Sequence, residues 1–205
     1  MRANCPELPT ALFIIAVIFV AATGCVTAGK VETDSGPPLT PEQRAEADAL
    51  EAAIENIRAK CEEQAPAVTC TLPWVVVSET VSVAVYRNGS VFIPPQQLHP
   101  AFRAVVAHEL SHHYFSDARN CRGERLIGCE RNANVHGVQV LMVGYGYDFP
   151  TAARLMHDYL VFAVNNVNKP SPGHPDACAE LHDFEQRMFA TPQTLYPCTE
   201  QAVTR

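Results

Sequence analysis

The strongest constraint on the fold is a segment near the middle of the chain, His108-Glu109-Leu110-Ser111-His112. An α-helix turns once in about 3.6 residues, so side chains at positions i and i+4 lie one above the other. The two imidazoles can therefore bind one zinc ion together. Glu109 then lies beside the metal, where a carboxylate can serve as general base toward a zinc-bound water. The segment predicts a helix that carries a catalytic metal site of the peptidase kind.

The residues before this segment support a helix and argue against a chance match. Pro100 suits a first helical turn, and Phe102, Val106 and Leu110 recur on one face. We therefore expect a helix with a core-facing side next to its metal-binding side.

Composition limits the number of domains and the kind of partner. A chain of 205 residues with 47% hydrophobic and 18% charged residues is long enough for one domain with a real core. Its net charge of -7 and the absence of a Lys/Arg run argue against nucleic acid as a partner.

The N-terminus indicates export. The apolar stretch 12–22 follows Arg2 and ends in small residues, as in a cleaved signal. The segment Ala22-Thr23-Gly24-Cys25 resembles a bacterial lipobox, which would make Cys25 the lipidated first residue; ordinary cleavage nearby is the alternative. We predict a lipoprotein signal peptide at 1–24, a flexible tether at 25–40 and a single zinc metallopeptidase domain at 41–205. Such a protein is anchored by lipid in a bacterial envelope, facing the periplasm, and Val26 favours the outer membrane.

Cysteine usage agrees with an oxidising compartment. Of eight cysteines, Cys5 falls in the signal and Cys25 is assigned to lipid, which leaves six. Their grouping predicts three local disulfides: Cys61 with Cys70, Cys121 with Cys129, and Cys178 with Cys198. A cysteine zinc site is the weaker alternative, because no CxxC spacing occurs.

Local patterns predict an α+β fold. Thr40-Pro41-Glu42-Gln43 is typical of a capped helix start, and we expect that helix to reach about Cys61. Strands are expected at 74–77, 81–86 and 91–93, with Asn88-Gly89 as a type I′ hairpin turn. We expect a small antiparallel sheet with this hairpin, packed on a zinc-bearing pair of helices, and a mostly helical C-terminal part. The strand at 91–93 is either an edge that holds an extended peptide or an internal strand.

A hydrolytic zinc site needs a third protein ligand. Glu130 is the best candidate, because it opens a second helical stretch in which Ala133, Asn134 and Gly137 follow at helical spacing. Small residues there allow close approach to the first helix. Asp117 and Glu124 are the weaker alternatives.

From Trp74 to Met156 the chain resembles the gluzincin metallopeptidases that include HtpX, BepA and the CAAX prenyl proteases. The resemblance rests on the HExxH helix, on Glu-x-x-Ala-Asn at 130–134 with Gly137, on Gly144-Tyr145-Gly146-Tyr147-Asp148, and on Gly173-His174-Pro175. It implies a zincin-like fold with zinc bound by His108, His112 and Glu130, and with Asn134 orienting a ligand histidine. The chain departs from the family in carrying Asn134 instead of Asp and in its short interval between His112 and Glu130.

The expected reaction also needs a donor to the developing oxyanion. His174 is the first choice, and Tyr145, Tyr147 and Tyr196 are alternatives. The leading prediction is a zinc metalloendopeptidase that binds protein or peptide substrates in extended conformation. The alternatives are a binding or chaperone-like lipoprotein that keeps the peptidase fold and a cell-wall peptide amidase.

Overall fold

The computed structural model describes residues 29–34, 36–64, 70–115, 121, 125–166 and 176–189. The predicted signal peptide and Cys25 lie outside these residues, as do Asp117, Glu124, His174, Tyr196 and Cys198. The described chain is α+β and mostly helical, as expected, with a small sheet.

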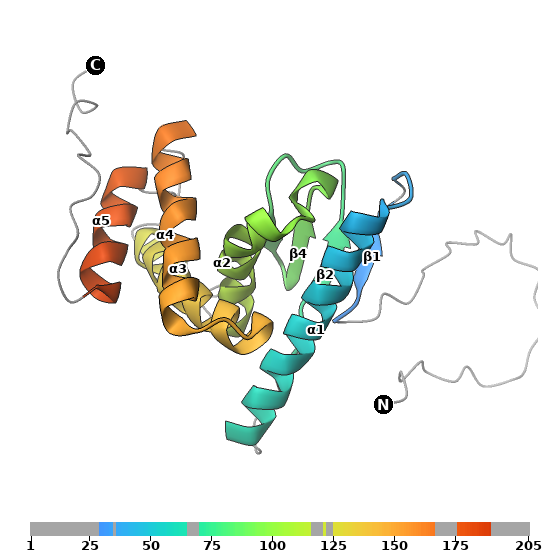
Figure 1. The fold of residues 1–205 in the computed structure, drawn as a ribbon, viewed down its shortest axis with the longest axis horizontal. Helices are drawn as coiled ribbons and strands as arrows, with labels where there is room; N and C mark the ends of the chain where they lie inside the picture. The colour runs from blue at the N-terminus through green and yellow to red at the C-terminus, as the bar shows by residue number, and fades with distance from the viewer. Residues whose placement is uncertain are drawn as a thin grey trace, which may run out of the picture.

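The sheet consists of β1 (Val31–Thr33), β2 (Trp74–Val77), β3 (Val85–Arg87) and β4 (Ser90–Ile93). The helices are α1 (Pro41–Gln64), α2 (Arg103–Tyr114), α3 (Arg125–Tyr145), α4 (Phe149–Asn166) and α5 (Ala177–Met188), and two 3-10 turns at Pro95–Gln97 and Pro100–Phe102 lead into α2. In Figure 1 α2 lies in the middle, with the sheet and α1 on one side and α3, α4 and α5 on the other.

The sheet is mixed, so the expectation of an antiparallel sheet is wrong. Its strand order is β1-β2-β4-β3, and only the β3–β4 pair is antiparallel. The centre is formed by β2 and β4, whose Val75, Val77, Val91 and Ile93 are buried. These residues alternate with less buried ones along both strands, so one face of the sheet belongs to the core.

The hairpin turn forms where the sequence predicts it, but β3 begins only at Val85, so most of the strand expected at 81–86 does not form. Asn88 and Gly89 have φ of 51° and 86°, as a two-residue type I′ turn requires. Because β4 pairs with β2 on one side and β3 on the other, residues 91–93 are internal, and the free edge on this side of the sheet belongs to β3.

The predicted tether is also shorter than expected, because residues 31–33 form β1 within the domain. Val31 is buried, and its N–H donates to Glu51 Oε1 of α1 at 2.8 Å. β1 pairs with β2, whose backbone would otherwise form an open edge. The strand is only three residues long and its neighbours have little apolar content, so the sequence pattern did not predict it.

Helix α1 begins as predicted, with a capping box. The Gln43 N–H donates to Thr40 Oγ1, and the Thr40 N–H donates to Gln43 Oε1. One turn further on, the buried Glu46 holds Arg103 through two hydrogen bonds of 2.7 Å. This pair joins α1 to the first residue of α2.

Helices α2 and α3 pack closely against each other at His108. A Cβ added at Gly137 would lie 3.4 Å from the His108 backbone nitrogen and 2.5 Å from Met156 Cε. Ser111 Oγ lies 2.7 Å from the His108 carbonyl oxygen and 3.0 Å from that of Ala133. The expectation that small residues let α3 approach the HExxH helix is confirmed.

The local disulfide pairing is confirmed for Cys61–Cys70 and for Cys121–Cys129. Cys178 is also disulfide-bonded, while its expected partner Cys198 lies outside the described residues.

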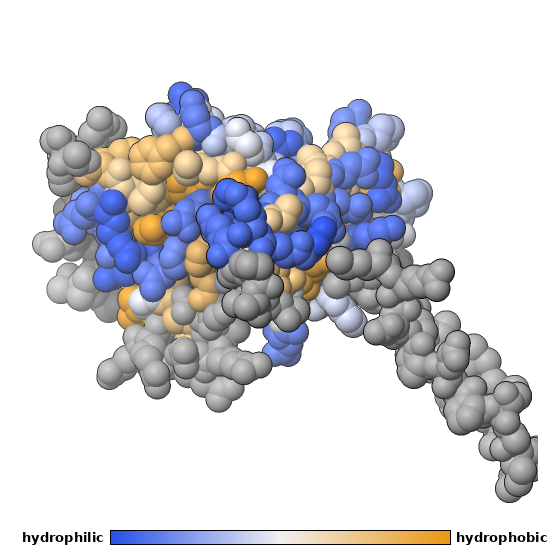
Figure 2. Space-filling model, turned by 90° about the horizontal axis from the view of Figure 1, so that it is seen from below, coloured by the Kyte–Doolittle hydropathy of each residue, from blue (hydrophilic) through white to orange (hydrophobic). Residues whose placement is uncertain are grey.

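The surface differs between the two ends of the molecule. Viewed from below, apolar residues gather toward the end that carries α4 and α5, and hydrophilic residues cover much of the middle (Figure 2). Within the described residues, no helix is long and apolar enough to cross a membrane.

Candidate metal centre

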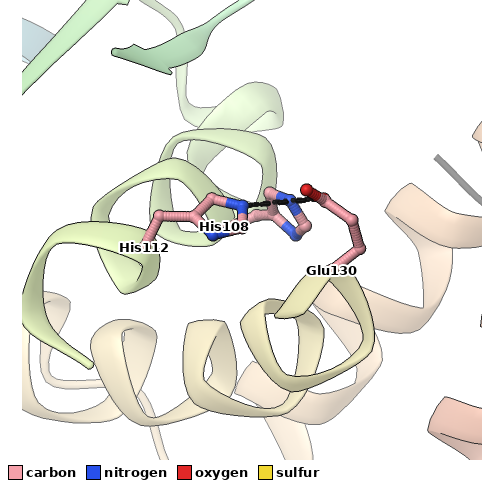
Figure 3. Close-up of side chains that lie close together, drawn as sticks. All are labelled: His108, His112 and Glu130. Atoms are coloured by element: carbon pink, nitrogen blue, oxygen red, sulfur yellow. Dashed lines mark hydrogen bonds and ion pairs between the residues drawn. The ribbon is translucent and has the colours of Figure 1, made fainter. Parts of the chain in front are cut away.

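Three side chains from two helices converge at one point. His108 and His112 project from successive turns of α2, and Glu130 reaches them from the first half of α3 (Figure 3). His108 Nε2 lies 3.2 Å from His112 Nε2 and 3.1 Å from Glu130 Oε2. The remaining distance, from His112 Nε2 to Glu130 Oε2, is 3.6 Å.

These distances suit a tetrahedral metal ion. Ligand atoms about 2.0–2.1 Å from such an ion stand about 3.3–3.4 Å from one another. The three measured separations, 3.1, 3.2 and 3.6 Å, bracket that value. The group could therefore hold a metal ion, and its His₂Glu donor set matches that of hydrolytic zinc sites.

Asn134 determines which nitrogen of His108 faces the other ligands. It is buried, and its Oδ1 lies 2.8 Å from His108 Nδ1. An amide oxygen can only accept, so Nδ1 carries a proton in this contact, and Nε2 is the nitrogen that faces His112 and Glu130. Asn134 thus contacts one of the two histidines, which is the position that the resemblance to the gluzincins implies.

The ligand group attracts positive charge. Burial by itself lowers the pKa of His108, but the carboxylates of Glu130 and Glu109 overcome this and raise the pKa to about 9. Burial likewise raises the pKa of Glu130, yet hydrogen bonds from His108 and His112 hold it far below its usual range. Two imidazoles and a carboxylate arranged in this way favour a cation between them.

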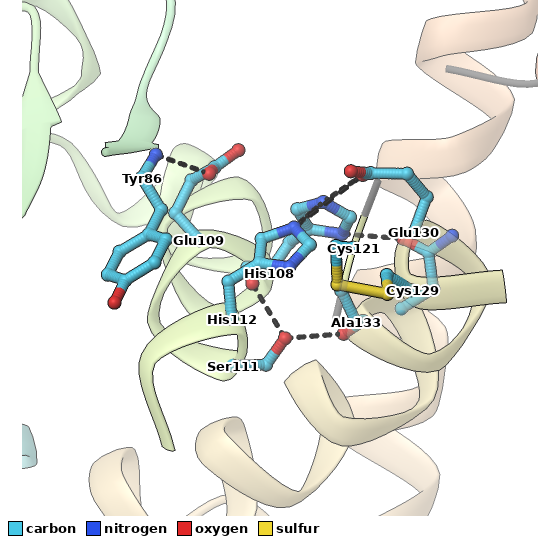
Figure 4. A network of polar contacts seen from close by, with 10 residues as sticks. Tyr86, His108, Glu109, Ser111, His112, Cys121, Cys129, Glu130 and Ala133 are labelled. Atoms are coloured by element: carbon cyan, nitrogen blue, oxygen red, sulfur yellow. Dashed lines mark hydrogen bonds and ion pairs between the residues drawn. A yellow bond between two sulfur atoms is a disulfide. The ribbon is translucent and has the colours of Figure 1, made fainter. Parts of the chain in front are cut away.

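Glu109 lies on the side of the two histidines that faces the sheet, while Glu130 lies on the other side (Figure 4). Its Oε2 accepts a hydrogen bond of 2.7 Å from the Tyr86 N–H of β3. Burial raises the pKa of Glu109, and the charges of His108 and His112 partly oppose this. A buried carboxylate of raised pKa beside a metal site is well placed to accept and return a proton.

The Cys121–Cys129 disulfide ends one residue before Glu130 (Figure 4). It closes a short loop at the start of α3, and Cys129 is buried. The bridge therefore restrains the helical turn that presents the third ligand.

Other candidates from the sequence lie elsewhere. Tyr147 accepts a hydrogen bond from Arg103 at 2.8 Å, and Tyr145 lies under the same guanidinium at 4.9 Å. Both rings are thus engaged with the first residue of α2. His113, the next residue after the HExxH segment, lies against Thr71 and Tyr86.

Two residues near the site were not singled out from the sequence. Tyr159 of α4 has its ring centroid 6.3 Å from that of His108, and burial and the charges of Glu109, Glu180 and Glu130 raise its pKa. Glu180 of α5 places a buried Oε1 near Asn134. Tyr159 carried only a weak signal, a hydroxyl between the apolar residues Met156 and Leu160, and Glu180 carried none.

Compared with protein-family models, with curated proteins and with solved structures, the chain matches none of them.

Proposed function

We propose that the protein is a zinc metalloendopeptidase of the bacterial cell envelope, of the gluzincin type that its motifs resemble. The observation that carries the proposal is the triangle of His108, His112 and Glu130 donor atoms with the buried Glu109 carboxylate beside it. The predicted signal peptide, lipidated Cys25 and disulfides support export to the envelope.

Zinc suits this donor set, and when bound it polarises a substrate carbonyl and makes water nucleophilic near neutral pH. His108, His112 and Glu130 would hold it, with the Asn134 contact keeping the His108 lone pair directed at the ion. With only three protein ligands, the ion would keep a coordination position for water or substrate.

Glu109 is the general base of the proposed reaction. The Tyr86 N–H engages its Oε2 and leaves Oε1 for the attacking water. Burial raises the pKa of Glu109 and so favours its protonated form, which can pass the proton to the departing amine.

Tyr159 is the described residue best placed to donate to the developing oxyanion. Its ring lies beside His108, and its raised pKa keeps the hydroxyl protonated at neutral pH. His174 remains a further candidate from the sequence.

The β3 edge is the proposed platform for an extended substrate. β3 pairs only with β4 among the described strands, and its Tyr86 N–H already points at Glu109. A peptide that adds to this edge would run past the general base.

Glu109→Gln in the full-length protein tests the proposal. Gln can still accept from the Tyr86 N–H, so the fold and zinc content should remain, while a carboxamide cannot take a proton. We expect wild type to cleave members of a peptide library, read by mass spectrometry, and Glu109→Gln to lose at least about 100-fold in rate.

Glu130→Gln is the companion variant and should lose zinc as well as activity. Equal cleavage by wild type and Glu109→Gln would overturn the proposed mechanism. Zinc binding without cleavage of peptides would favour a binding protein, and cleavage of muropeptides alone would favour an amidase.

A further inference from the structure

Helix α5 brings a carboxylate to the side of the metal centre that faces away from the sheet. α5 packs on α3 and α4, at the end of the molecule opposite to the sheet (Figure 1). Glu180 lies in its first turn, and its Oε1 is buried. Burial raises the pKa of Glu180 to about 7, while the charges of His108 and Glu130 act on it with opposite signs. Glu180 is therefore close to the ligand group without belonging to it.

The residue between Glu180 and His108 is Asn134. Asn134 Oδ1 accepts from His108 Nδ1, which leaves the two N–H donors of Nδ2 for another partner. Asn134 Nδ2 and Glu180 Oε1 are both buried, and neither makes a hydrogen bond of standard geometry with the described residues. The Asn134 side chain is nevertheless close enough to Glu180 to lower the pKa of that carboxyl, the direction expected of a nearby donor.

A buried donor on α3 and a buried acceptor on α5, which packs on α3, link Glu180 through Asn134 to His108. A negative charge at the Nδ2 end of the amide strengthens Oδ1 as an acceptor. A stronger acceptor holds the Nδ1 proton more firmly and makes Nε2 a better metal ligand. A neutral amide alone does this less well than a carboxylate.

We infer that Glu180 is a positioning residue of the metal centre, which acts through Asn134 to orient His108 and to strengthen metal binding. The inference rests on the metal site of the proposed function but not on peptide cleavage. It also assigns α5 a role, since docking of this helix completes the chain of contacts behind His108.

A purely structural role for Glu180 makes a different prediction. Glu180 lies in the first turn of α5, where an acidic side chain is favoured by the helix dipole. In that case its replacement would affect the stability of α5 and leave zinc affinity unchanged.

The test is a zinc competition titration against a chromophoric chelator, with the full-length oxidised protein in detergent. Glu180→Gln should weaken zinc binding by about tenfold. Glu185→Gln is the matched control, because Glu185 is a buried carboxylate of the same helix that pairs with His157 at 2.9 Å instead of facing Asn134. The control should keep the zinc affinity of wild type.

A rescue variant separates positioning from helix docking. Asn134→Asp combined with Glu180→Gln places a carboxylate directly against His108 Nδ1, so zinc affinity should return to within a few-fold of wild type. Unchanged affinity in Glu180→Gln, equal losses in Glu180→Gln and Glu185→Gln, or failure of the rescue would each overturn the inference. If wild type binds zinc without cleaving peptides, the proposed function fails while these affinities still decide the role of Glu180.

Discussion

At the scale of single residues, neighbours rather than residue type decide what each histidine of α2 does. The carboxylates of Glu130 and Glu109 raise the pKa of His108, although the side chain is fully buried. Burial lowers the pKa of His113, which lies beside the Thr71 carbonyl. The same side chain is thus part of a cation-attracting group at one position and a neutral packing residue five positions later.

Tyr159→Phe isolates the role of one hydroxyl in the proposed reaction. Because the hydroxyl is expected to act in the transition state, kcat should fall by about 100-fold with little change in KM or zinc affinity. Steady-state kinetics on the best library peptide measures this. Tyr145→Phe is the control, because Tyr145 packs under Arg103 and should keep the activity of wild type. An unchanged kcat in Tyr159→Phe would remove Tyr159 from the mechanism.

At the scale of elements, the metal centre depends on how the first turns of α3 are held against α2. Gly137 and Ser111 bring the two helices close, and the Cys121–Cys129 bridge restrains the chain just before Glu130. The second bridge, Cys61–Cys70, closes a loop of nearly equal length at the end of α1. The two disulfides therefore form a natural comparison.

Replacing each pair of cysteines by serine should have the same effect on stability but different effects on zinc. Either double variant should lower the free energy of unfolding by about 2–3 kcal/mol, because the closed loops are similar in length. Only Cys121→Ser/Cys129→Ser should also weaken zinc binding, since only that loop positions a ligand. Denaturant titration and zinc competition measure the two effects. Equal zinc affinity in both variants would show that the bridge does not position Glu130.

At the scale of the whole molecule, the candidate site lies on α2, between the sheet on one side and helices α3, α4 and α5 on the other. Tyr86 of β3 contacts Glu109 from one side, and Glu130 and Glu180 approach from the other. The candidate metal centre therefore depends on how the sheet packs against the helices. Removal of a bound metal should accordingly lower the free energy of unfolding of the whole domain.

Metal-free protein should lose stability as pH rises. The folded-state pKa of His108 is about 9, against an ordinary value of 6.5, so its contribution is complete below pH 6.5 and is lost as pH rises through 9. The expected loss for chelator-treated protein is up to about 3 kcal/mol. Zinc-loaded protein should not show this fall, because the metal replaces the proton on Nε2. Denaturant titrations from pH 6 to 10 measure both forms, and parallel pH curves would contradict the prediction.

Features encoded within a few residues could be predicted from the sequence alone. The HExxH helix, the Asn88-Gly89 hairpin, the Thr40 capping box and two local disulfides depend on contacts over ten residues or fewer. Glu130 could be proposed as third ligand because helical spacing and nearby small residues mark one face of α3.

Only the tertiary structure decided which distant elements meet. The parallel pairing of β2 with β4, the entry of residues 31–33 into the sheet, and the approach of Tyr159 and Glu180 to the ligand group have no local signal. These contacts depend on how helices and strands that are distant in the sequence pack to bury their apolar faces. That packing is determined by the whole chain and not by a local segment. The sequence thus determined the chemistry that α2 and α3 can offer, and the fold determined which side chains surround it.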